Sequence, residues 1–323
     1  MPTRDGRGPD HEEVLLLWSA RRTGVIDALT TTAGTAEGVA DETRLARETC
    51  ARFVQALADY GYLRRVGGEY EVTNRALGFL ATRDVRSIGA TPRALDLLDA
   101  MAGLGTNGSE RDDERSDAAD ADAPDDGSER TLRHRLGANA AIPSADVRAG
   151  VTAAVHAAPD AERVVDVWGA SGVYAAEFAR RGYEATLVDS ADVLDVVGPM
   201  LAGQGVETVA AEFPMVPAAD VDLALLAGVV RRHDPETNER LLRSVRDALA
   251  PGGAVVVLEP LRDRSSEARR VAVERLAVGR GDAYGGETVE QWLRTAGFVD
   301  RETRNVPGTA GQAVVGRRER GVE

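Results

Sequence analysis

The second half of the chain alternates short apolar runs with amphipathic helical segments, and this alternation constrains the fold more than any other feature. Four runs indicate buried strands, because each is short and almost continuously apolar. They are RVVDVWG, EATLVDS, VDLALLAGVV and AVVVLEP, between residues 163 and 260. Strands that are apolar on both faces and separated by helices form a parallel sheet with helices on both sides. We therefore expect an α/β fold with a doubly wound, Rossmann-like sheet.

Helical segments complete this pattern, and two of them carry glycines where a helix is expected to stop. NERLLRSVRDALAPGG precedes the fourth run and ends in two glycines, and GETVEQWLRTAGF ends at Gly297. In doubly wound sheets, ligands bind outside the carboxyl ends of the strands. The residues that follow the four runs are therefore the first candidates for a functional site.

The first part of the chain, residues 11–102, has the pattern of helices followed by a hairpin. Gly24 interrupts the first helical stretch, and Thr35 is a suitable N-cap for the next one. Alternating residues flank Gly67-Gly68, which has the chemistry of a two-residue hairpin turn. Helices followed by a hairpin make a winged helix, so a mainly helical N-terminal domain of this type is expected.

Winged helices often bind DNA, which makes a transcription factor one hypothesis. The expected recognition helix carries Arg44, Arg47 and Arg52, but Glu48 and Asp59 offset them. The whole chain has 39 basic and 53 acidic side chains and a net charge of −14, whereas surfaces that bind nucleic acid are positive. We expect a homodimer through this domain instead, because the consecutive apolar residues 15–18 exceed what one small core can cover.

Composition favours a cytoplasmic protein. There is no run of about eighteen apolar residues, and no apolar stretch follows the first arginines as it would in a secretory signal. Cys50 is the only cysteine and lies on an apolar helical face, which favours core packing. Every basic residue is arginine, and this bias together with the acidity is compatible with a salt-adapted haloarchaeal cytosol; an acidic mesophile is the alternative.

Residues 103–130 form a polar segment between the two halves. GLGTNGSERDDERSDAADADAPDDGSER is dominated by Asp, Glu, Ser and Gly. It cannot bury enough apolar surface to offset the entropy lost on ordering, so we expect a disordered acidic insert. A charged tail with a specific partner is the alternative. The second domain then spans residues 131–318.

The segment DVWGASG, from Asp166 to Gly172, follows the first expected strand and opens a helix. A glycine-rich turn at this place lets the backbone approach a cofactor and offers helix N–H groups to it. Asp189 ends the second expected strand, at about the spacing at which a carboxylate binds ribose hydroxyls. These residues fit a nucleotide-type cofactor, although any strand–helix unit needs a turn here.

The order of these segments resembles the class I S-adenosylmethionine-dependent methyltransferases, specifically the small-molecule O-methyltransferases with an N-terminal winged-helix dimerisation domain. The similarity covers most of the chain from about residue 12 to residue 316, apart from the acidic insert, and includes VVDVWGASG, LVDS, AAEFP and DALAPGGAVVVLEP. It implies S-adenosylmethionine as the cofactor and a small molecule as the methyl acceptor. The residues implied at the cofactor are Asp166, Trp168, Gly169 and Gly172 for the methionine part, Asp189 for the ribose, and Glu212 and Phe213 for the adenine end.

Two residues of the loop depart from the family's pattern, which has glycine at alternate positions after the acidic residue. Trp168 and Ala170 occupy the first two of these positions, and only Gly172 is kept. An indole beside the cofactor either reshapes the pocket or closes it, and the methyl group of Ala170 takes room where the backbone must approach closely. Some RNA-modifying methyltransferases of this fold carry Phe or Tyr at the first position, so an aromatic residue does not by itself exclude cofactor binding.

A further departure concerns the base that removes a proton from the acceptor hydroxyl. In the family, a His after the fourth strand resembles the general base, and a Glu on the next strand orients it. An ungapped count back from AVVVLEP places Glu259 on that Glu and Arg231 at the His position. Arg cannot accept the proton, because its pKa lies above about 12. Either the loop shifts so that His233 serves, or the acceptor needs no base; His233 as a plain surface residue is the third alternative.

Two functions of different classes follow. The first is an S-adenosylmethionine-dependent methyltransferase that acts on a small molecule at oxygen. The second is a catalytically degenerate relative, which keeps the fold as a binding or regulatory protein with an altered or lost cofactor site. The sequence has no Cys/His cluster with metal spacing, no P-loop and no Ser nucleophile motif, so neither a metal centre nor phosphoryl transfer is expected. Neither a membrane nor a nucleic acid is expected as a partner.

Overall fold

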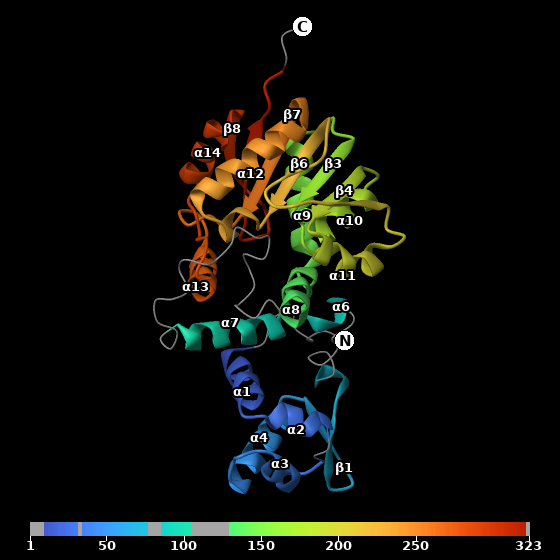
Figure 1. Ribbon diagram of the computed structural model, residues 1–323, viewed down its shortest axis with the longest axis vertical. Helices are drawn as coiled ribbons and strands as arrows, with labels where there is room; N and C mark the ends of the chain where they lie inside the picture. Colours follow the sequence, from blue (N-terminus) through green and yellow to red (C-terminus); the bar gives the residue numbers. More distant parts are fainter. Residues whose placement is uncertain (1–9, 32–33, 77–84, 105–128, 321–323) are drawn as a thin grey trace. The chain divides into compact units, whose positions relative to one another are not determined.

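The computed structural model describes residues 10–31, 34–76, 85–104 and 129–320 (Figure 1). These residues form two compact units. One contains the described residues up to Asp99 together with Arg133–Ala138, and the other contains the remaining described residues. The expected acidic insert 103–130 lies mostly outside the described residues. Its two ends belong to α7 (Thr91–Gly103) and α8 (Glu129–Ala140).

The first unit is built from helices and one hairpin. Besides most of α7 it contains α1 (His11–Arg22), α2 (Val25–Thr31), α3 (Ala36–Glu42), α4 (Arg47–Asp59), β1 (Leu63–Val66), β2 (Glu69–Val72) and α6 (Val85–Ile88). Gly24, with a φ of 78°, separates α1 from α2, and the Thr35 side chain caps α3 by accepting the N–H of Gly38 at 3.1 Å. Val66 pairs with Glu69, so Gly67 and Gly68 form the predicted two-residue turn. The predicted helices and hairpin are therefore present.

The core of the first unit lies between α1, α4 and α7. Leu17, Val54 and Leu95 are buried there, and Cys50 lies among them with no exposed surface, as the sequence predicted. Leu15, on the same helix as Leu17, is 49% exposed. The helix α1 thus presents large apolar side chains both to the core and to its outer side.

A seven-stranded sheet forms the second unit, with the strand order β5-β4-β3-β6-β7-β9-β8. Its strands are β3 (Arg163–Val167), β4 (Glu184–Asp189), β5 (Val206–Ala210), β6 (Val221–Ala227), β7 (Leu249–Glu259), β8 (Val299–Asn305) and β9 (Gln312–Arg317). The strands β3 to β7 are parallel to one another, whereas β9 runs antiparallel to β7 and β8. The predicted doubly wound α/β sheet is confirmed, and the four predicted strands correspond to β3, β4, β6 and β7.

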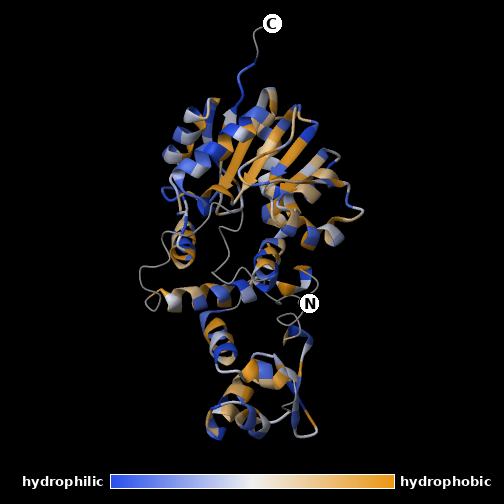
Figure 2. Ribbon diagram, in the orientation of Figure 1, coloured by the Kyte–Doolittle hydropathy of each residue, from blue (hydrophilic) through white to orange (hydrophobic). Residues whose placement is uncertain are grey.

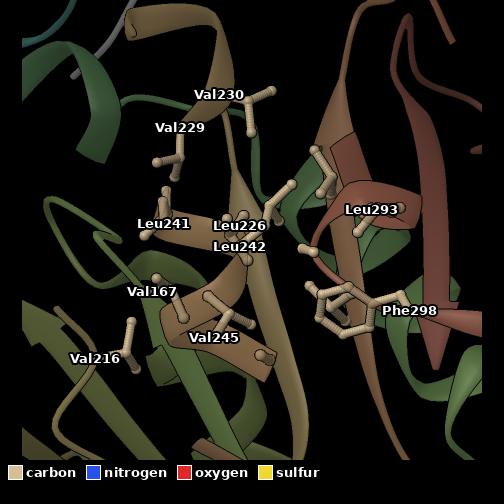
Figure 3. Close-up of a cluster of buried hydrophobic side chains, with 14 of the residues drawn as sticks. Val167, Val216, Leu226, Val229, Val230, Leu241, Leu242, Val245, Leu293 and Phe298 are labelled. Atoms are coloured by element: carbon tan, nitrogen blue, oxygen red, sulfur yellow. The ribbon is translucent and has the colours of Figure 1, made fainter. Parts of the chain in front are cut away.

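Helices cover both faces of this sheet. Successive residues of a strand point to opposite sides, so each strand contributes to both cores. Val165 and Leu226 point toward α12 (Pro235–Ala248) and α14 (Gly286–Thr295), a core drawn in Figure 3. Val164 and Leu225 point to the opposite face, toward α9 (Ser144–Ala157) and α10 (Val173–Arg180). Figure 2 shows the apolar strands between helices whose outer faces are polar. The unit is completed by α11 (Ala191–Leu201) and α13 (Ala268–Val278).

The helix α12 ends before the two glycines at which the sequence predicted its end. It begins at Pro235, where the Asp234 side chain accepts the N–H of Thr237 at 2.9 Å, and it ends at Ala248. The next residue, Leu249, already pairs with Val221 in the sheet, so the two glycines lie inside β7 and do not stop the helix. By contrast, α14 does end just before Gly297. Within the described ranges, no helix combines the length and apolar content needed to cross a membrane.

Candidate functional site

The segment from Asp166 to Gly172, called the loop below, contains the last two residues of β3 and the turn into α10, and β3 lies between the neighbouring strands β4 and β6. Its backbone is left-handed at alternate positions, since φ is 54° at Trp168, 54° at Ala170 and 71° at Gly172. Glycine adopts such angles without steric cost. These three positions are also the ones at which the methyltransferase pattern has glycine. The loop therefore keeps a glycine-type conformation although two of the three residues are not glycine.

This conformation is held by hydrogen bonds from outside the loop. The N–H of Trp168 donates to the carbonyl of Val188 at 2.8 Å, and the N–H of Ala170 donates to Asp189 Oδ2 at 2.8 Å. A left-handed backbone costs an L-residue with a Cβ about 1–2 kcal/mol. Strain of this kind persists where the surroundings impose it, and it clusters at functional sites. The loop is thus a strained segment fixed by the neighbouring strand.

Asp166 is buried at the start of the loop. Its Oδ2 accepts the N–H of Ala175 at 3.1 Å, and its Oδ1 has no hydrogen-bond partner among the described residues. Burial raises the pKa of Asp166 to about 7, against the opposing effect of the Ala175 hydrogen bond. A Cβ on Gly169 would lie 2.3 Å from the Asp166 carboxyl group, so only glycine fits there. The site therefore contains a buried carboxylate oxygen to which none of the described residues donates a hydrogen bond.

The end of β4 and the helix α8 support the other side of the loop. Asp189 is buried, and its Oδ1 accepts the N–H of Ser190 at 2.8 Å. The backbone N–H of Ser171 donates to Asn139 Oδ1 at 3.1 Å, and the Ser171 hydroxyl contacts the same oxygen. The parallel strands β3 and β4 end at one edge of the sheet, which brings Asp166 and Asp189 to this loop.

Three rings lie together next to the loop. The rings of Trp168 and Phe213 meet edge to face with centroids 5.1 Å apart, and Phe213 stacks on His233 with centroids 4.1 Å apart and planes at 18°. Trp168 is 4% exposed, and its Nε1 finds no hydrogen-bond partner in the part of the chain that the structure describes. Glu212, which precedes Phe213, is exposed. The indole is thus a packed side chain whose buried N–H meets no acceptor among the described residues.

Arg231 and Glu259 meet at the ends of the adjacent strands β6 and β7. Arg231 belongs to a single 3-10 turn, Val230–Arg232, that follows β6. Its backbone N–H donates to Glu259 Oε1 at 3.3 Å, and its Nη1 lies 3.5 Å from Glu259 Oε2. Burial raises the pKa of Glu259, and the charge of Arg231 opposes that rise. A Cβ on Gly228 would lie 2.6 Å from Arg231 Nη2, so the guanidinium lies close against that glycine.

His233 follows this turn and is held through its backbone. Its carbonyl accepts the Tyr284 hydroxyl at 2.7 Å and the Asn238 amide at 3.2 Å. Its backbone is extended, with a φ of −123°, and its ring lies on Phe213. The structure therefore brings Arg231 to Glu259, and His233 to the aromatic group with Trp168 and Phe213.

Several residues of the site were not found from the sequence. Tyr174 is one. Burial raises the pKa of its hydroxyl to about 12, and the charge of Asp166 raises that pKa further, which connects Tyr174 to the site. Arg275 is another: it is buried in α13, and its charge lowers the pKa of Glu259. Asn139, which holds Ser171, is the third. Their spacing along the chain carries no signal, because each comes from a different helix.

Comparisons with known proteins agree with this architecture. A family model described as "Methyltransferase domain" matches residues 135–303, and a model described as "HVO_A0261 N-terminal domain" matches residues 11–91. A curated relative, 3-hydroxy-5-methyl-1-naphthoate 3-O-methyltransferase of Streptomyces sahachiroi, is 29% identical over 164 residues, which are 47% of this chain and 48% of the relative. The match thus spans about half the length of that relative.

Solved structures show the same fold over nearly the whole chain. Human N-acetylserotonin methyltransferase, solved in complex with SAM, has a TM-score of 0.61 at 19% identity and covers 95% of this chain and 94% of its own. The N,N-8-amino-8-demethyl-D-riboflavin dimethyltransferase RosA of Streptomyces davawensis has a TM-score of 0.66 at 18% identity and covers 95% and 96%. At these identities the likeness establishes the fold alone.

Proposed function

The chain belongs to the methyltransferase domain family, and from this premise we propose that it transfers a methyl group from S-adenosylmethionine to an oxygen atom of a small molecule. The observation that carries the proposal is the loop from Asp166 to Gly172, which keeps left-handed angles at Trp168 and Ala170 in spite of their side chains. The curated relative that the chain resembles is, by its name, an O-methyltransferase of a hydroxynaphthoate. S-adenosylmethionine, when bound, supplies a methyl group on a positively charged sulfur.

The residues around the loop fit this cofactor. Asp166 Oδ1 is a buried acceptor that lacks a donor among the described residues, and the ammonium group of the methionine part would supply one. Asp189 holds one backbone N–H on each oxygen, and a carboxylate oxygen can accept more than one hydrogen bond, so ribose hydroxyls can still bind there. We assign Trp168, Gly169 and Gly172 to the wall of the methionine part.

We assign Glu212 and Phe213 to the adenine end and the region of Arg231 and Glu259 to the acceptor. The exposed Glu212 and the half-buried ring of Phe213 lie after β5, beside the loop. On the acceptor side, Glu259 positions Arg231. His233, whose ring stacks on Phe213, is the alternative base.

Calorimetry of the full chain with S-adenosylmethionine and with S-adenosylhomocysteine tests the proposal. We expect binding of both, and a loss of about tenfold or more for Asp189→Asn, because a buried charge-assisted hydrogen bond is worth about 1.5–3 kcal/mol. The matched control is Asp195→Asn, an exposed carboxylate on α11, which should leave binding unchanged. If neither ligand binds at millimolar concentration in high salt, the chain is instead a degenerate relative that has lost the cofactor site.

We further propose that the first unit is a winged-helix domain through which two cytoplasmic copies pair. Its order of helices and hairpin supports the first part. The second part is supported by the consecutive apolar residues 15–18 of α1, of which Leu17 is buried in the core while Leu15 is 49% exposed. Light scattering should give a dimer at micromolar concentration. Leu15→Arg should weaken the dimer, whereas Arg52→Ala, a change on the exposed face of α4, should not. A monomeric wild-type protein would refute the pairing.

A further inference from the structure

Tyr174 is the second residue of α10 and follows the loop almost directly. Its side chain is half-buried, so part of it stays open to solvent or to a ligand. Its hydroxyl forms no hydrogen bond with any of the described residues. A phenolic hydroxyl can both donate and accept a hydrogen bond. This hydroxyl is therefore available to a ligand that binds at the loop.

The ring of Tyr174 is placed by the neighbouring helix α9. A Cβ on Gly150 of α9 would lie 3.0 Å from Tyr174 Cε1 and 2.9 Å from Leu258 Cδ1. The ring and the Leu258 side chain thus both lie against this glycine, and Leu258 is the last residue but one of β7. The ring therefore reaches from the start of α10 toward the ends of the central strands.

The charges around the Tyr174 hydroxyl place it close to Asp166. Burial raises the pKa of this hydroxyl to about 12, and Asp166 is the charge with the largest effect on it. Asp146 and Glu259 raise the pKa further, and Arg231 lowers it. Because Arg231 and Glu259 lie within 3.5 Å of each other, their effects partly cancel. The hydroxyl thus keeps its proton at neutral pH, and the field of the carboxylates there favours a cation.

An ammonium group at Asp166 needs more than one acceptor. It carries three N–H donors, and a buried donor without a partner costs free energy. Asp166 Oδ2 already accepts the N–H of Ala175, which leaves Oδ1 as the open oxygen of this carboxylate among the described residues. A second acceptor on another side chain would also fix the direction of the group. The Tyr174 oxygen meets this requirement.

We propose that Tyr174 is a second binding residue for the methionine part of the cofactor, and that its hydroxyl oxygen accepts a hydrogen bond from the ammonium group that also binds Asp166. This inference rests on the proposed use of S-adenosylmethionine. The hydroxyl gives up no proton and takes no part in methyl transfer; it holds and orients the methionine part. S-adenosylhomocysteine carries the same ammonium group, so the contact can be measured without turnover.

Calorimetry of the full chain with three ligands tests the inference. They are S-adenosylhomocysteine, an analogue of it in which hydrogen replaces the amino group, and 5′-methylthioadenosine, which lacks the whole amino-acid part. Tyr174→Phe should weaken S-adenosylhomocysteine binding about tenfold or more, because the lost hydrogen bond is to a charged group, and should leave the other two ligands unchanged. Asp166→Asn should give the same pattern. The matched control is Tyr183→Phe, a half-buried tyrosine against Phe178, which should change none of the three.

The pattern over the three ligands decides the outcome. A loss by Tyr174→Phe that is confined to S-adenosylhomocysteine supports the inference. A loss shared with the deaminated analogue would place the hydroxyl at the carboxylate of the methionine part, and a loss shared by all three ligands would show a structural role; both overturn the inference, as does every other pattern. Binding of 5′-methylthioadenosine by the variant reports that its nucleoside site is intact.

Failure of this inference is distinguishable from failure of the proposed function. If the wild-type chain binds S-adenosylhomocysteine and Tyr174→Phe binds it equally well, only the role of Tyr174 is refuted. If the wild-type chain binds none of the three ligands, the proposed function fails, and the inference fails with it.

Discussion

Replacing Trp168 by glycine and by alanine separates the strain of its backbone from the packing of its ring. Both variants remove the same buried indole, so both lose about 3–5 kcal/mol of packing. They differ only in whether a Cβ is present at a φ of 54°. The difference between the two variants therefore measures the left-handed strain directly.

The expected difference in stability between the glycine and the alanine variant has the opposite sign to the difference at an ordinary helical position. At position 168, relief of left-handed strain favours glycine by about 1–2 kcal/mol, and the freedom of glycine in the unfolded chain costs about 0.4–1 kcal/mol. Trp168→Gly should thus be more stable than Trp168→Ala by about 0.5–1 kcal/mol. At Ala176, inside α10, replacement by glycine should instead cost about 1 kcal/mol.

Urea unfolding of the full chain, followed through Trp292, measures these differences, because Trp292 is buried in the same unit and remains after Trp168 is removed. Ala170→Gly provides a second test at a φ of 54° without the loss of a large ring, and it should cost less than Ala176→Gly. If glycine at 168 is less stable than alanine by the amount found for Ala176→Gly, the loop is not left-handed and the reasoning fails.

Three further outcomes follow from the same site and its neighbours. Gly169→Ala should destabilise the second unit by about 2 kcal/mol or more, because the added Cβ would lie 2.3 Å from the Asp166 carboxyl group. Thermal unfolding measures this loss. Gly198→Ala in the helix α11 is the control and should be neutral or stabilising. Asp166 has a folded pKa of about 7 against 3.8 in the unfolded chain, so the folded state holds the proton more tightly and stability should fall as pH rises between these values. Asp166→Asn should remove that fall, and an unchanged pH profile of the unfolding midpoint would contradict the assignment. A hydrogen bond from the Arg180 side chain lowers the pKa of Glu177. The stability that this pair contributes should therefore be present above about pH 4.5 and lost as pH falls further. Glu177→Gln should abolish that acid-dependent loss.

The central strands of the sheet could be predicted from the sequence because burial on both faces forces them to be apolar. The strands β3, β4, β6 and β7 meet that condition. At the two edges of the sheet, β5 and β8 are exposed or half-buried along their length, and their sequences VETVA and VDRETRN lack an apolar run. The strand β9 is buried, but its apolar stretch is only a few residues long. Edge position and shortness therefore explain the three strands that the sequence did not reveal.

The sequence also identified the departures in the loop without showing their structural effect. Trp168 and Ala170 could have forced a different turn, because residues with a Cβ avoid positive φ. The groups that hold the turn are the carbonyl of Val188 and the carboxylate of Asp189, both supplied by β4. The conformation of the loop is thus set by a neighbouring strand, and the pattern of the loop's own residues does not contain that information.

Arg231 and His233 show how one turn of the backbone separates two candidate residues that are close in the sequence. The two residues are separated by one position, but Arg231 lies in a 3-10 turn and His233 in an extended backbone, so their side chains leave the chain in different directions. Arg231 meets Glu259, and His233 meets Phe213. The adjacent parallel strands β6 and β7 bring Arg231 and Glu259 together, the two positions at which the ungapped count had placed the family's His and Glu. Arginine at this position keeps the contact to the carboxylate and cannot take up a proton.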